Sequence, residues 1–156
     1  MEVYEKIVKL NHDSSNYRQL QRYLLACCAS YKKYRSSGDL ENGLNVASKY
    51  IDGRETWKKL HRYEWELEGE AFGIEYYIDG INYFKYHPDK AMLLDLRKIR
   101  IQKRLNQDEA LEYLDSLAYF IVYVFSYCYR ASNDLPPQKY AQFLCPKLFN
   151  RFFCVG

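Results

Sequence analysis

The chain has few of the residues that interrupt helices or build common catalytic sites. Its 156 residues include only seven glycines and four prolines, so few tight turns are available. Three histidines and five cysteines are scattered without the paired spacing of zinc modules. The chain also has no glycine-rich phosphate loop and no serine elbow. We therefore expect long helices, and we expect no catalytic residue, metal site or cofactor.

The net charge and the hydropathy pattern exclude further classes of protein. A formal net charge of +3 is low for a dedicated binder of phosphate backbones. No secretory pattern is present at the N-terminus, and the uncharged run Ser116–Tyr129 is shorter than the roughly 20 residues of a membrane span. The adjacent pair Cys27 and Cys28 fits free thiols in a reducing compartment. We expect a cytoplasmic protein that has no membrane partner.

Apolar residues are abundant and recur at helical spacing. Hydrophobic residues make up 48% of the chain, and 17 residues are tyrosines, which suit the edge of a core. Alternating spacings of three and four predict the following helices: Val3–Leu10, one with a stripe from Leu20 to Tyr34, one from Leu40 to Ile51, Arg54–Ile78, one from Pro88 to about Leu105, one after Asn106, and a short one ending at Cys145. The sequence predicts a single all-α domain over residues 1–156, a bundle of five to seven helices.

Helix ends and faces are also readable. Asp39 is a plausible N-cap, Gly53 a left-handed helix stop, and Asn106 with Glu109 a capping box. The helix after Pro88 is expected to place Met92, Leu93, Leu96 and Ile99 in the core. In the longest helix one apolar face comprises Trp57, Leu60, Leu67, Ala71, Ile74 and Ile78, and a second comprises Trp65, Phe72 and Tyr76. Two apolar faces predict that this helix is packed on both sides.

The sequence KYHPDK contains His87, Pro88 and Asp89, and this looks like the J-domain signature. In J-domains a His-Pro-Asp turn between two helices stimulates the ATPase of an Hsp70 chaperone. The preceding segment, Tyr77–Phe84, has no basic residue, and Ala91–Leu105 lacks the family's Phe and Ala-Tyr pair. We interpret the match as a coincidental helix start. A J-domain-like co-chaperone remains an alternative function.

The densest basic run comprises Arg97, Lys98, Arg100, Lys103 and Arg104. Basic side chains beside exposed tyrosines can hold single-stranded nucleic acid. A solvated helix face, or pairing with the acidic run Glu64–Glu70, explains the same pattern and is the preferred interpretation. Weak nucleic-acid binding is the second alternative.

Two consecutive segments resemble a known family. Leu24-Leu25-Ala26-Cys27-Cys28 lies within Arg18–Tyr34, and Leu44–Gly53 reads LNVASKYIDG. Together they are similar to an uncharacterised family of bacterial all-helical proteins, which have a Leu-rich Ala-Cys-Cys helix and then a Val-Ala-x-x-Tyr-x-Asp-Gly helix. This chain departs from the family at Ala29-Ser30, where an arginine pair would stand. The resemblance implies a helix-packing motif made of Leu24, Cys27, Cys28, Ala47 and Gly53, and it implies no catalytic site.

These features favour a helical module that binds another protein. Tyrosine provides a large contact area at a low entropic cost, so a tyrosine-rich surface suits a protein partner. One specific form is a small protein that sequesters or neutralises a partner such as a toxin or defence factor. We expect a non-enzymatic protein-binding module, with protein a better partner than nucleic acid.

Overall fold

A computed structural model describes residues 2–79, 90–131 and 135–153. Its elements are α1 (Val3–Leu10), η1 (Ser14–Asn16), α2 (Tyr17–Ala29), η2 (Lys32–Tyr34), α3 (Gly38–Ile51), α4 (Trp57–Asp79), α5 (Lys90–Lys103), α6 (Gln107–Tyr129), η3 (Gln138–Phe143) and α7 (Pro146–Phe153), where η denotes a 3-10 helix. These residues contain no strand, which confirms the all-α class. The expected five to seven helices are too few once the short 3-10 helices are counted.

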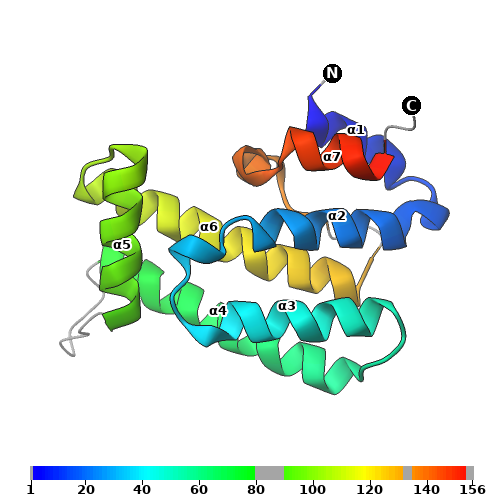
Figure 1. Ribbon diagram of the computed structural model, residues 1–156, viewed down its shortest axis with the longest axis horizontal. Coiled ribbons are helices and arrows are strands. Elements are labelled where there is room, and N and C mark those ends of the chain that lie inside the picture. Colours follow the sequence, from blue (N-terminus) through cyan, green and yellow to red (C-terminus); the bar gives the residue numbers. More distant parts are fainter. Residues whose placement is uncertain (1, 80–89, 132–134, 154–156) are drawn as a thin grey trace.

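Helix α6 is the centre of the fold. It packs against α2, α4, α5 and η3, while α3 packs on both α2 and α4. In Figure 1, α2, α3, α4 and α6 lie roughly alongside one another, α5 crosses them at one end, and α1 and α7 lie beside α2. The stripe predicted for α6 is buried along its whole length, comprising Leu111, Leu114, Ala118, Ile121, Phe125 and Cys128. An apolar helix that is surrounded by other helices explains its uncharged sequence.

The predicted start of α6 is confirmed. The Asn106 side chain accepts a hydrogen bond from the Glu109 N–H at 2.8 Å, and the Glu109 carboxylate accepts one from the Asn106 N–H at 3.0 Å. This reciprocal pair satisfies two of the free N–H groups at the helix start. None of the described helices has the length and hydropathy needed to cross a bilayer.

Two predicted helix ends near the cysteine pair are wrong. Helix α2 ends at Ala29 and does not continue to Tyr34. The Ser30 hydroxyl donates to the carbonyl oxygen of Cys27 at 2.6 Å, and the 3-10 helix η2 then carries Tyr34 into the core. The N-cap position of α3 is Ser37, so the predicted cap, Asp39, lies inside the first turn. An acidic residue there is favourable for the helix dipole, which explains why the sequence pattern resembled a cap.

The C-terminal prediction is also wrong. The segment before Cys145 forms the 3-10 helix η3, and a further α-helix, α7, begins at Pro146. Proline suits the first position of a helix because its missing N–H would have no partner there. The Phe149 side chain of α7 is buried and lies edge-on to the Tyr23 ring, with ring centroids 5.5 Å apart. Helix α7 therefore covers α2.

The faces of α4 and α5 differ from the prediction. On α4, the buried residues Leu60, Leu67, Ala71 and Ile74 form one packed face. The second apolar face is exposed, so the expectation that α4 is packed on both sides is wrong. On α5, Leu93 is exposed while Asp95 is buried beside Met92, Leu96 and Ile99. The apolar pattern identified these helices, but it did not decide which faces other elements cover.

Candidate functional site

The residues singled out by the sequence lie in different parts of the molecule. His87, Pro88 and Asp89 lie outside the described residues, and the J-domain-like interpretation stays a prediction. The basic run lies on α5 and immediately after it. The packing motif, Leu24, Cys27, Cys28, Ala47 and Gly53, lies on α2, on α3 and at the end of α3. The structure does not bring these groups together into one site.

The basic run presents its three arginines, Arg97, Arg100 and Arg104, to solvent. None of them forms an ion pair with another residue in the described part of the chain. The Lys103 ammonium lies 5.5 Å from the centroid of the Tyr113 ring, and Lys98 is half-buried. Three glutamates of α4 form ion pairs, with Arg35, His61 and Arg62. No ion pair joins α4 to α5 in the described residues, so the alternative of pairing with the acidic run is absent there.

The cysteine pair faces the core. Cys27 and Cys28 are fully buried, as are Leu24 and Ala47 of the same motif, and Gly53 has a φ of 76°, the left-handed conformation of a helix stop. The Cys27 sulfur accepts a hydrogen bond from the backbone N–H of Cys145 at 3.4 Å. Cys27 therefore packs towards the segment that enters α7, whereas Cys28 lies near Cys128 of α6.

Burial makes these thiols poor nucleophiles. Desolvation raises the pKa of the Cys27 thiol to about 11, and desolvation followed by the nearby thiols of Cys27 and Cys128 raises the pKa of Cys28 well above its ordinary value. A thiol is reactive as the thiolate, which both shifts disfavour. Within the described ranges no group of three histidine, cysteine or carboxylate side chains could hold a metal ion. The motif acts as packing in this structure.

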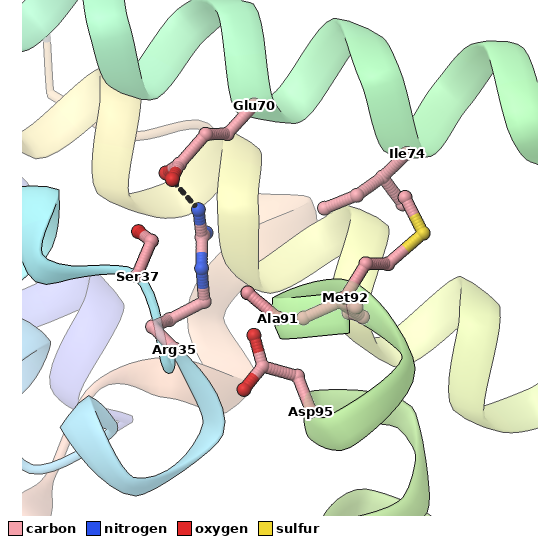
Figure 2. A pocket seen from close by; sticks show the side chains of 8 residues that line it. Arg35, Ser37, Glu70, Ile74, Ala91, Met92 and Asp95 are labelled. Carbon is pink, nitrogen blue, oxygen red and sulfur yellow. Dashed lines mark hydrogen bonds and ion pairs between the residues drawn. The ribbon is translucent and has the colours of Figure 1, made fainter. Parts of the chain in front are cut away.

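A buried polar cluster joins three elements at the end of the bundle where α5 crosses. Arg35, from the turn before α3, donates from Nη2 to Glu70 Oε2 of α4 at 2.6 Å, and its side chain is only 4% exposed. Asp95 Oδ1 of α5 accepts from the Ser36 N–H at 2.9 Å and from the Ser36 hydroxyl at 2.6 Å. Figure 2 shows the Arg35 guanidinium directed towards Glu70, with Ser37 on one side and Asp95 near the base of the Arg35 side chain. The cluster fixes the positions of α3, α4 and α5 relative to one another.

The cavity inside this cluster is small. It has a volume of about 50 Å³, whereas small-molecule sites usually have roughly 300–1,000 Å³. Arg35 Nη1 and Ser37 Oγ are buried there without a hydrogen-bond partner among the described residues. Burial raises the pKa of Asp95 to about 6, against the lowering effect of the hydrogen bonds from Ser36 and of the charge of Arg35. The cluster can bind and release a proton, but it is too small for an organic substrate.

Among the residues that the structure describes, the most exposed aromatic side chains lie on α4. We define the α4 aromatic face as Trp65, Phe72 and Tyr76, whose exposed fractions are 71%, 40% and 48%. The Phe72 and Tyr76 rings are stacked with centroids 6.4 Å apart, and Phe72 also contacts the Tyr119 ring edge-on. Large aromatic side chains that are exposed along one side of a helix are typical of surfaces that bind a partner. The face is therefore a candidate interaction site.

Sequence reasoning found the residues of the α4 aromatic face but assigned them to the core. Sequence reasoning missed the cluster of Arg35 and Asp95. Asp95 lies on the same face of α5 as Met92, Leu96 and Ile99, and a carboxylate on an otherwise apolar face indicates a buried polar contact. Comparison of the chain with protein-family models, with curated proteins and with solved structures gave no match. The resemblance to the bacterial helical family thus stays a prediction from the sequence.

Proposed function

We propose that this protein is a non-enzymatic protein-binding module and that the α4 aromatic face is its recognition surface. The observation that carries the proposal is the exposure of Trp65, whose side chain protrudes from the helix with Phe72 and Tyr76 along the same side. Tryptophan and tyrosine are enriched in the residues that contribute most to protein–protein affinity. An exposed tryptophan otherwise keeps a large apolar surface in water, which is unfavourable.

The thiols support the non-enzymatic part of the proposal, and we also propose that the protein is cytoplasmic. The four cysteines of the described residues are free, which fits a reducing compartment. Their burial disfavours nucleophilic chemistry, because the thiolate form is strongly penalised at Cys27 and Cys28. The buried polar cluster around Arg35 and Asp95 links helices, and its cavity is too small for an organic substrate.

A capture experiment with matched variants tests the proposal. Tagged wild-type protein is compared with Trp65→Ala and Phe72→Ala, and with Ile101→Ala as the control, because Ile101 of α5 is 67% exposed and lies outside the α4 face. We expect a stoichiometric partner to be retained by the wild type and by Ile101→Ala but to be lost with the two α4 variants. Equal retention by all four proteins would contradict the proposed surface.

Nucleic-acid binding is a second candidate because of one observation: Arg97, Arg100 and Arg104 are exposed and have no acidic partner in the described part of the chain. Binding through these arginines would weaken steeply with salt, since each phosphate contact releases counterions. Reversal of the three charges should abolish it. Binding that is unaffected by salt or by the reversal would exclude this candidate.

A further inference from the structure

The α4 aromatic face is the centre of a longer exposed stripe. Its seven positions alternate in spacing between four and three residues, and all seven are exposed: Lys58, Arg62, Trp65, Gly69, Phe72, Tyr76 and Asp79. We call this the α4 seam. A repeat of three and four residues is the pattern by which one helix packs lengthwise against another. No described element of the same chain covers the seam.

The seam is chemically complementary to itself when it is reversed. Its outer positions, Lys58 and Asp79, carry opposite charges, and the next positions inward are Arg62 and Tyr76, a guanidinium and a ring that can stack upon it. Further inward are Trp65 and Phe72, two aromatic rings. A second copy of the helix running antiparallel would therefore place each side chain against a suitable partner.

The central position is Gly69. A glycine inside a helix lowers helix stability relative to alanine, and nothing lies within 4 Å of the position that a Cβ atom would take. The packing within this chain therefore gives no reason for a glycine there. Small residues at the centre of a helix pair allow two backbones to approach closely. The two-fold axis of an antiparallel pair would pass beside Gly69.

The charges along α4 run against its own helix dipole. The first turn contains Lys58 and no acidic residue, while the end of the helix contains Glu75 and Asp79 and no basic residue. An isolated helix is stabilised by the opposite arrangement. An antiparallel partner would place the acidic end of one helix beside the basic end of the other, which makes this arrangement favourable.

A hollow beside Trp65 provides space for a side chain of the second helix. It is about 440 Å³ in volume and is lined by Lys58, His61, Arg62, Trp65 and Glu66. Phe72 of a second copy is the aromatic residue that the reversed seam would bring to this end of α4. A large side chain inserted into such a hollow is the usual packing of paired helices.

We infer that α4 pairs with α4 of a second copy of this chain, antiparallel and about a two-fold axis near Gly69. This inference rests on the proposed role of the α4 aromatic face as an interaction surface. Covering the exposed parts of its three rings on both copies removes roughly 600 Å² of aromatic surface from water. That is a small interface, so the dimer should dissociate on dilution.

Sedimentation velocity from about 2 to 200 μM tests the inference, since mass action makes a weak dimer concentration-dependent. Lys58→Glu and Asp79→Lys should each raise the dimer dissociation constant at least about tenfold, because like charges then face each other. An equimolar mixture of the two variants, and the double variant, should both restore dimer formation. Ile101→Ala is the control and should behave as the wild type.

Three results would overturn the inference: a wild type that stays monomeric throughout, single variants that dimerise like the wild type, or a mixture that is no better than its components. Lys58 and Asp79 are exposed and outside the core, so their replacement leaves the fold intact, which circular dichroism checks. Failure here is distinguishable from failure of the proposed function. A monomer that still loses its captured partner with Trp65→Ala retains the proposed surface and excludes only the second copy.

Discussion

Replacement of Asp95 by asparagine should remove a large part of the pH dependence of stability. The Asp95 side chain is buried, with only 4% of the residue exposed, and it accepts two hydrogen bonds from Ser36. Asparagine has nearly the same shape and keeps an oxygen that can accept both bonds. The substitution therefore removes the charge of the ionised form while preserving the contact between α5 and the turn before α3.

The raised pKa of Asp95 sets the direction and the size of its contribution to the pH dependence of stability. Burial raises the pKa of Asp95 from 3.8 to about 6, so the folded state holds a proton more tightly than the unfolded state does. This contribution to stability is fully present below pH 3.8 and is lost as the pH rises through 6. Between pH 4.5 and 7.5 the wild type should lose about 2 kcal/mol through this group, and the Asp95→Asn variant should not.

Urea unfolding of both proteins at several pH values measures the difference. The free energy of unfolding of the variant minus that of the wild type should rise by about 2 kcal/mol between pH 4.5 and 7.5. Asp115, whose pKa burial also raises to about 6, titrates in both proteins and cancels. Ser36→Ala removes a hydrogen bond that favours the ionised form, so it should make the pH dependence steeper. A difference that stays flat with pH would refute the desolvation argument.

Three further predictions concern the helix stop, the helix cap and the thiols. Gly53→Ala should lower the free energy of unfolding by about 1 kcal/mol, because the backbone φ at this position is +76°. Gly69 lies in open space within a helix, so Gly69→Ala should raise the free energy of unfolding by up to about 1 kcal/mol. Thermal unfolding of dilute protein measures both changes, and equal effects of the two variants would contradict the assignment of Gly53 as the helix stop. Asn106→Ala should cost about 1 kcal/mol in urea unfolding, and Asn106→Asp, which keeps the acceptor, should cost much less. Among the four cysteines that the structure describes, alkylation followed by site in mass spectra should modify the partly exposed Cys145 before the three buried thiols. Rapid labelling of Cys27, Cys28 or Cys128 would disprove their packing role.

Much of the helical framework could be predicted from the sequence. The boundaries of α1 and the capping box of α6 are confirmed, because each depends on interactions within a few residues. The buried stripe of α6 is also confirmed, because a helix this apolar is buried whichever elements cover it. The left-handed stop at Gly53 is confirmed for the same reason. The end of α2 was placed too late and the 3-10 helix η3 was predicted as a helix ending at Cys145, since a 3-10 turn and an α-turn share similar spacing over a few residues. Helix α7 was missed.

The candidate sites could be predicted only in part. The apolar pattern placed Trp65, Phe72 and Tyr76 on one side of α4, but an exposed face and a packed face have the same period. The Arg35–Glu70 pair joins residues 35 positions apart, and the contact of Ser36 with Asp95 joins residues 59 positions apart. No local pattern specifies partners at such separations.

The helical class, most of the helices and the buried stripe of α6 could be read from the sequence, because hydrogen bonding and apolar periodicity act within a few residues. Only the packing of the whole chain shows that one apolar face of α4 is uncovered and that Asp95 is enclosed beside Arg35 (Figure 2). The reason is physical: burial depends on which distant elements pack together, and each helix can offer more apolar surface than its neighbours cover.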